Sequence, residues 1–298
     1  MIRQRRLLVT GGTGLIGKSF ILTMEAAGWR VRNLTRAPHH ARDIAWNPSQ
    51  GVLPTEALDG VDVVVHLAGE NLAEGRWTEA RRRLIRESRV LGTELLAKTM
   101  AQKKGNPSVF ISASGASCYL DDGFIHDEHS PLGRSFLAQL VREWEAACHP
   151  AREAGIRTVH MRMGMVLDPH GGALSKMLPF YRKGLGGIIG SGRQHLNWIT
   201  VRDLIRIIQF CIDYEFIQGP LNAVSPKPVR QAEFASVLAS YVGKPALVPL
   251  PRYVVKLLYG QMGEELLLGD MNVIPAYLRD SGFEWLDSSL DLALKNIL

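Results

Sequence analysis

The sequence predicts an α/β fold in which a doubly wound parallel sheet of the Rossmann type is covered by helices on both faces. Up to Gly164, apolar runs of strand length alternate with segments of helical periodicity, which is the pattern of a parallel sheet with right-handed crossovers. A glycine-rich turn joins the first strand to the first helix. The run VDVVVHL at residues 61–67 is apolar almost throughout, as expected of a central strand buried on both faces.

The stretch around this turn is the most informative part of the chain. Residues 7–9 read as an apolar strand, residues 15–24 as an amphipathic helix, and a second strand ends near residue 35. The glycine spacing fits a dinucleotide fingerprint in two registers, GxGxxG and TGxxGxxG, which together use Thr10, Gly11, Gly12, Gly14 and Gly17. A pyrophosphate lies against the N–H groups of a helix N-terminus, where a side chain would hold it away. We therefore expect a nucleotide at this turn.

The end of the second strand indicates which nucleotide is bound. NAD-binding chains usually carry Asp or Glu at this place to bind the ribose 2′-hydroxyl, whereas an arginine can receive the 2′-phosphate of NADP. This chain has Thr35 and Arg36 there and no acid. The position favours NADP(H), and the alternative is an arginine that is merely solvated at a strand end.

The composition is that of a globular protein with one elaborate domain or two intimate ones. The chain has 298 residues, of which 46% are hydrophobic and 21% are charged. Its three cysteines, Cys118, Cys148 and Cys211, are scattered, which suggests neither a disulfide framework nor a metal site and favours a reducing, cytoplasmic compartment. The basic start MIRQRRLL leads into GGTG without a cleavage site, and no apolar run approaches a membrane span, so we expect no membrane partner.

The formal net charge of +6 raises the possibility of a nucleic-acid partner. The densest arginine cluster, at residues 81–89, shares a helical pattern with Leu84, Leu91 and Leu95, and a solvated helix face explains it better. No nucleic-acid module accompanies the cluster. An anionic cofactor or substrate accounts for the basic excess, so we expect a small-molecule partner and no nucleic acid, and the oligomeric state stays open.

The remaining elements follow in order, with a change of pattern after Gly164. Strands are expected at 43–46, 61–67, 108–112, 157–163 and 220–224, and helices at 78–100, 136–153, 199–214, 231–241, 253–259 and 288–298. Residues 165–198 are rich in glycine and show no rhythm of strands and helices. We therefore assign residues 1–164 to a nucleotide-binding domain to which 199–224 return, and residues 165–198 and 225–298 to a smaller, mainly helical substrate-side domain. Small residues end the strand at 61–67, where a doubly wound fold binds its ligand, so Leu67 and Ala68 should border the cofactor.

The sequence resembles the extended and atypical short-chain dehydrogenase/reductases, and within them the branch labelled "epimerase family protein" or "cell-division inhibitor". The resemblance covers essentially the whole chain. It is carried by TGGTGLIG (10–17), LAGEN (67–71), the spacing from Arg76-Trp77 to Ser88-Arg89, the block 171–199, and the tail segments NAVSPKPV, AEFASVLA and KPALVPLP.

This resemblance implies a Rossmann sheet, a C-terminal substrate-side domain and NADP(H) as cofactor. It places the cofactor against one set of residues: Gly11, Thr13, Gly14, Leu15, Ile16, Gly17, Thr35, Arg36, Leu67, Ala68, Gly69, Arg89 and Arg162. For Arg89 and Arg162 the assignment depends mainly on the resemblance. From the residues by themselves, both are ordinary surface or ion-pairing arginines.

The sequence lacks the catalytic YxxxK motif of this superfamily. Catalytic relatives use YxxxK, in which the tyrosine is the general acid/base and the lysine lowers its pKa. No tyrosine in this chain has a lysine four residues later, and Phe136 and Leu140 stand near the expected place. Tyr119, with Ser114 or Ser117 beside it, is the best remaining proton donor, and a core tyrosine with a satisfied hydroxyl is the alternative.

Other polar residues are candidates for the substrate side. Lys176 could turn into the cleft or be solvated, and Gln194, His195 and Trp198 should border the substrate pocket. Two hypotheses follow. The first is an NADP(H)-dependent oxidoreductase or epimerase-like enzyme that transfers hydride to or from a small hydroxyl or carbonyl compound, which could be anionic, with Tyr119 or a water moving the proton. The second is a catalytically silent NADP(H)-binding sensor or regulatory protein.

Overall fold

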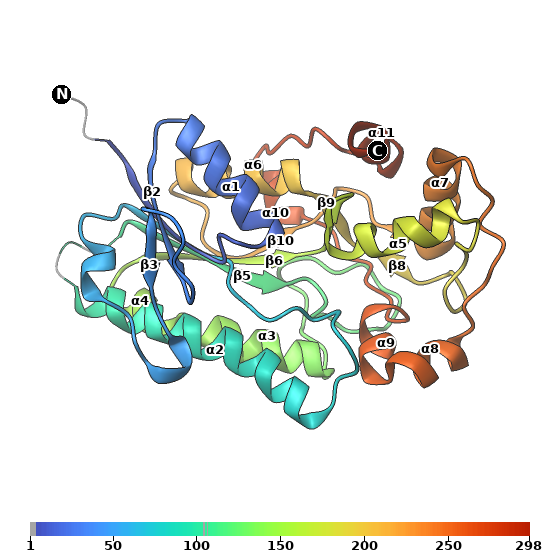
Figure 1. Cartoon of the computed structure of the whole chain (residues 1–298), viewed down its shortest axis with the longest axis horizontal. Coiled ribbons are helices and arrows are strands. Elements are labelled where there is room, and N and C mark those ends of the chain that lie inside the picture. Colours follow the sequence, from blue (N-terminus) through green and yellow to red (C-terminus); the bar gives the residue numbers. More distant parts are fainter. Residues whose placement is uncertain (1–3, 104, 106) are drawn as a thin grey trace.

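A parallel sheet forms the centre of the computed structural model, which describes residues 4–103, 105 and 107–298. In this part of the chain the sheet has seven strands in the order β10-β6-β5-β4-β1-β2-β3, and all its pairings are parallel. Helices α1 and α6 lie on one face and α2, α3 and α4 on the other (Figure 1). The predicted Rossmann-type fold class is thereby confirmed.

The first part of the chain contains most of the sheet. Its elements are β1 (Arg6–Thr10), α1 (Leu15–Ala26), β2 (Arg30–Thr35), β3 (Asp43–Ala45), η1 (Pro48–Gln50), η2 (Thr55–Leu58), β4 (Val63–His66), α2 (Glu79–Gln102), β5 (Val109–Gly115), α3 (Phe136–Ala146), α4 (His149–Glu153) and β6 (Arg157–Met163). The second part adds β7 (Met165–Asp168), α5 (Gly172–Arg182), β8 (His195–Leu196), β9 (Trp198–Thr200), α6 (Val201–Asp213), β10 (Gly219–Ala223), β11 (Val229–Arg230), α7 (Gln231–Val242), α8 (Arg252–Tyr259), α9 (Gln261–Leu266), α10 (Ala276–Asp280) and α11 (Leu290–Ile297). No helix among the described residues is long and apolar enough to cross a membrane.

Side chains of the central strands alternate between two apolar layers. In β1, Leu7 and Val9 belong to the layer under α1 and α6, whereas Leu8 belongs to the layer under α2 and α4. In β5, Ile111 and Phe110 divide in the same way. This two-residue period, with both sets buried, explains why these strands read as continuous apolar runs.

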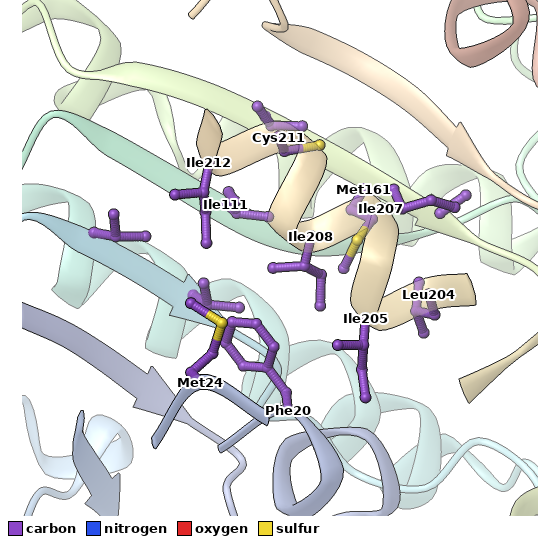
Figure 2. Close-up of a cluster of buried hydrophobic side chains, with 14 of the residues drawn as sticks. Phe20, Met24, Ile111, Met161, Leu204, Ile205, Ile207, Ile208, Cys211 and Ile212 are labelled. Atoms are coloured by element: carbon purple, nitrogen blue, oxygen red, sulfur yellow. The ribbon is translucent and has the colours of Figure 1, made fainter. Parts of the chain in front are cut away.

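Helix α6 covers the sheet beside α1. Its apolar stripe includes Leu204, Ile208 and Cys211, which pack with Phe20 of α1 and Met161 of β6 in one buried cluster (Figure 2). The following strand, β10, pairs with β6 and extends the sheet at that edge. Residues 201–223 therefore return to the sheet after an excursion away from it.

A separate apolar cluster lies in the second part of the chain. It joins α5, α7 and α11 through Leu178, Phe234 and Leu294, with Trp198 buried among them. These helices gather at one end of the molecule with α8 and α9 nearby (Figure 1). This cluster stands beyond the carboxyl ends of the sheet strands, where doubly wound folds place their ligands.

Three element predictions were wrong in detail. The helix expected over 136–153 is broken between Ala146 and His149, because Pro150 has no N–H to continue it. The helix expected from residue 199 begins at Val201, since Thr200 accepts a hydrogen bond from the Asp203 N–H as its N-cap. Residues 165–198, expected to lack regular elements, contain β7, α5, β8 and the start of β9.

Candidate nucleotide-binding site

The glycine turn is packed too closely for a side chain at Gly11 or Gly17. Gly11 has φ of +72°, and a Cβ there would lie 2.8 Å from the carbonyl carbon of Leu67. Gly14 donates its N–H to the Gly11 oxygen at 3.0 Å and is the N-cap residue of α1. A Cβ on Gly17 would overlap that same oxygen. The fingerprint glycines thus allow the turn, β4 and the first turn of α1 to approach one another.

The hydroxyl of Thr10 fixes the end of β4 beside this turn. Its Oγ1 accepts the N–H groups of Leu67 at 3.2 Å and Ala68 at 3.1 Å, and lies 2.7 Å from Nδ1 of His66. Burial lowers the pKa of His66 to about 3, so the ring is neutral and Nδ1 can accept the threonine proton. The Thr10 side chain therefore helps to hold the Leu67–Ala68 segment against the glycine turn, beside the backbone bond from the Leu67 N–H to the Thr10 oxygen.

A cavity of about 340 Å³ opens between the glycine turn and the ends of β2, β3 and β4. It is lined by Gly11, Gly12, Thr13, Gly14, Leu34, Thr35, Arg36, Trp46, Asn47, Pro48, Ser49, Leu67, Ala68, Gly69, Glu70, Leu84, Glu87, Ser88 and Leu91. Most of the residues predicted to bind the cofactor are among them. Bare main chain at a helix N-terminus, with an arginine at the rim, suits the ribose and phosphate groups of a dinucleotide.

The other predicted cofactor residues are not among those that line this cavity. Leu15, Ile16 and Gly17 open helix α1, and Leu15 lies where a side chain at Gly171 would meet it. Arg89 is buried in α2 and donates from Nη2 to the Glu70 carbonyl oxygen at 2.9 Å. Its burial lowers its pKa to about 10. Arg89 therefore supports the Gly69–Glu70 segment from behind.

Arg162 belongs to a buried polar network at the ends of β5, β6 and β10. Its Nε and Nη2 donate to the two carboxylate oxygens of Glu145, both at 2.8 Å. Its Nη1 donates to the Tyr119 hydroxyl at 2.9 Å, and that hydroxyl donates to Asn222 Oδ1 at 2.7 Å. The hydroxyl of Ser114 donates to Glu145 Oε1 at 2.8 Å.

This network sets the protonation and the hydrogen bonding of the candidate proton donors. Burial raises the pKa of Tyr119, so the phenol stays protonated at neutral pH, and its hydroxyl is engaged on both sides. Ser114 is buried as well, whereas Ser117 is half-buried in the turn that follows β5. Three predicted catalytic residues are thus adjacent in the fold, two of them in hydrogen bonds that a substrate would have to replace.

Removing the Tyr119 hydroxyl should affect stability and leave nucleotide binding unchanged. Tyr119→Phe deprives Asn222 and Arg162 of a buried partner, which should cost about 1–3 kcal/mol of unfolding free energy. Urea unfolding and NADPH titration check this, with Tyr253→Phe on the exposed face of α8 as control. A weaker affinity for NADPH in Tyr119→Phe would contradict the placement of Tyr119 outside the nucleotide cavity.

Three of the predicted substrate-side residues, Lys176, Gln194 and Trp198, are engaged in contacts within the fold. Lys176 of α5 donates from Nζ to the Ala73 carbonyl oxygen at 3.2 Å and so crosses to the loop between β4 and α2. Gln194 donates to the carbonyl oxygens of Ile189 and Leu267, and Trp198 is fully buried. These contacts connect segments of the chain.

His195, in β8, is paired with an acidic side chain. Its Nδ1 lies 2.8 Å from Asp270 Oδ1, which also accepts the His195 backbone N–H at 2.7 Å. The two side chains are 20% and 24% exposed. The sequence does not indicate that Asp270 is the partner of His195, because Asp270 lies 75 residues away in the chain and in no recognisable motif.

Apolar packing fills the place of the missing YxxxK motif. Phe136 makes an edge contact with Trp77, at 5.1 Å between ring centroids, and Leu140 is buried in the same cluster. Sequence reasoning also missed Glu145, Asn222 and the cavity wall at residues 46–49. The last of these follows β3 at its carboxyl end, so the rule that ligands bind there could have identified it.

Comparison with known proteins assigns the family. The model of the "NAD dependent epimerase/dehydratase family" matches residues 7–220, and a "Domain of unknown function (DUF1731)" matches residues 250–297. The chain belongs to the epimerase family. An epimerase family protein of Mycobacterium tuberculosis is 37% identical over 288 residues, covering 96% of this chain and 95% of that protein. Human epimerase family protein SDR39U1 is 36% identical, covering 98% and 99%.

Solved structures of family members agree with the fold. The crystal structure of human SDR39U1 (isoform 2) with NADPH has a TM-score of 0.90 at 35% identity, covering 98% of each chain. A nucleoside-diphosphate sugar epimerase from Corynebacterium glutamicum has a TM-score of 0.83 at 31% identity, covering 99% of this chain and 58% of that one. The family and the sheet architecture predicted from the sequence motifs are confirmed.

Proposed function

We propose that this protein is an NADP(H)-dependent oxidoreductase or epimerase-like enzyme that acts on a small hydroxyl- or carbonyl-bearing compound. The observation that carries the proposal is the placement of Arg36 at the rim of the glycine-lined cavity, directly after β2. That position is where a 2′-phosphate distinguishes NADP from NAD. The human relative solved with NADPH supports the same cofactor.

Different residues of the cavity would bind different groups of this cofactor. The N–H groups of the glycine turn, at the N-terminus of α1, would bind the pyrophosphate. Thr35 and Arg36 would bind the 2′-phosphate, and Leu67, Ala68 and Gly69 would border the ribose side. When bound, the nicotinamide would donate or accept hydride. The chain itself must then move a proton, and Ser117 and His195 are more accessible for this role than the buried Tyr119.

Loss of the Arg36 side chain should remove the preference for the phosphorylated cofactor. Arg36→Ala deletes a charged hydrogen-bond donor for the 2′-phosphate, so NADPH affinity should fall about ten- to hundredfold while NADH affinity stays the same. Thermal-shift and calorimetric titrations with NADPH, NADP, NADH and NAD measure this. Arg42→Ala is a matched control, because Arg42 pairs with Glu25 on α1 and does not line the cavity. An unchanged preference in Arg36→Ala would refute the assignment.

A catalytically silent NADP(H)-binding protein is the second candidate. It is favoured by the apolar packing of Phe136 and Leu140 at the expected catalytic position and by the double hydrogen bonding of Tyr119. A screen of carbonyl compounds with NADPH oxidation as readout separates the two candidates. Reproducible, protein-dependent turnover of any compound would exclude the silent protein.

A further inference from the structure

An acidic side chain stands opposite Arg36, although the sequence has none at the end of β2. Glu70, in the segment after β4, places Oε1 at 3.9 Å from Arg36 Nη2 and Oε2 at 3.4 Å from Arg81 Nη1. Glu70 lines the nucleotide cavity, and its side chain is 23% exposed. An acid that NAD-binding chains carry after their second strand is thus supplied here from the segment after β4, which is separated from β2 by β1.

The position of Glu70 is fixed by helix α2. Its backbone N–H donates to the Ser88 hydroxyl at 3.1 Å, and its carbonyl oxygen accepts Arg89 Nη2 at 2.9 Å. Arg81, on the same helix, holds the carboxylate from the far side. A main chain held by both its N–H and its carbonyl group keeps this carboxylate at the cavity wall, whereas the Arg36 side chain is 78% exposed.

We propose that Glu70 sets the cofactor preference of this site by opposing the 2′-phosphate and accepting a hydrogen bond from a ribose hydroxyl. The inference rests on the proposed function, because it assumes that NADP(H) enters the cavity. A phosphate monoester carries nearly two negative charges at neutral pH, so a carboxylate beside Arg36 cancels part of the attraction that the guanidinium provides. A 2′-hydroxyl has no such conflict and gains an acceptor. Glu70 therefore narrows the preference for NADPH that Arg36 creates.

Neutralising the carboxylate tests this inference. Glu70→Gln should strengthen NADPH binding about three- to tenfold, while NADH binding stays equal or weakens, so that the ratio of the two affinities rises. This gain in NADPH affinity should be smaller at higher ionic strength. The repulsion between the Glu70 carboxylate and the 2′-phosphate acts at a partly solvent-exposed place, where salt screens it. Dissociation constants for both nucleotides, measured by calorimetry on the full chain at two salt concentrations, give this ratio.

Two further variants make the result specific. Glu74→Gln is the control, because Glu74 also pairs with Arg81, at 3.6 Å, but is 69% exposed and does not line the cavity, so the ratio should not change. Glu70→Asp keeps the charge and should keep the wild-type ratio. An unchanged or lowered ratio in Glu70→Gln would overturn the inference while leaving the cofactor assignment intact. If the wild-type protein binds neither nucleotide, the proposed function itself fails.

Discussion

Replacement of Arg162 by methionine is expected to cost about 3–5 kcal/mol of unfolding free energy, a large part of the stability of a typical protein. The change leaves the Glu145 carboxylate, which is only 14% exposed, with the Ser114 hydroxyl as its remaining side-chain donor, and it removes the group that donates to the Tyr119 hydroxyl. The loss of a charge partner in the interior exposes the full desolvation cost of the remaining ion. The midpoint of urea unfolding measures the effect.

A neighbouring ion pair supplies the control for this prediction. Arg86 pairs with Glu143, two residues from Glu145 on α3, but both side chains are largely exposed, so Arg86→Met should cost less than about 1 kcal/mol. The double variant Arg162→Met/Glu145→Leu should recover part of the lost stability, because no unpaired ion remains. If Arg162→Met and Arg86→Met lower the free energy of unfolding equally, the buried ion pair contributes no more to stability than the exposed one.

Addition of one methyl group at Gly17 is expected to abolish measurable NADPH binding, with a loss of at least about a hundredfold in affinity. The new Cβ would overlap the Gly11 oxygen and lie 2.8 Å from the Gly11 carbonyl carbon, so the turn that bears the predicted phosphate-binding N–H groups must move. Overpacking of this kind also costs about 1–3 kcal/mol of stability. Calorimetric titration of Gly17→Ala with NADPH, together with its melting temperature, tests both effects.

A second helical glycine provides the comparison. A Cβ on Gly92, inside α2, would lie 3.4 Å from Trp46 and 3.5 Å from His66, which is ordinary contact. Gly92→Ala should therefore bind NADPH as the wild type does and gain up to about 1 kcal/mol from helix propensity. If Gly17→Ala binds NADPH like Gly92→Ala, the close approach at Gly17 does not shape the nucleotide site.

The nucleotide half of the molecule could be predicted from sequence because its signals are local. The glycine turn, the strand before it and the residues after β2 lie within one short stretch, and apolar runs buried on both faces identify the parallel strands. The cofactor-side residues Gly11, Thr35 and Arg36 accordingly meet at one cavity. Local pattern, burial and topology agree there, which is the condition for reading structure from sequence.

The polar networks could not be predicted, because their members come from distant segments. Tyr119 and Asn222 are 103 residues apart, and His195 and Asp270 are 75 apart. Glu70 was visible in the LAGEN motif, but only the sheet order, which places β4 beside β1 and β1 beside β2, brings it opposite Arg36. Helix α5 was missed because glycines surround it and Pro179 stands inside it, which hides its helical pattern.

The return of α6 and β10 to the sheet determines the order in which the chain can fold. When a ribosome has released the chain only as far as Gly164, the outer edge of β6 has no partner and the apolar layer over β5 and β6 lacks the helix that covers it. An open strand edge beside uncovered apolar surface is prone to pair with other chains. We therefore expect that the nucleotide-binding half does not complete its fold during synthesis before the ribosome has released the chain as far as Ala223.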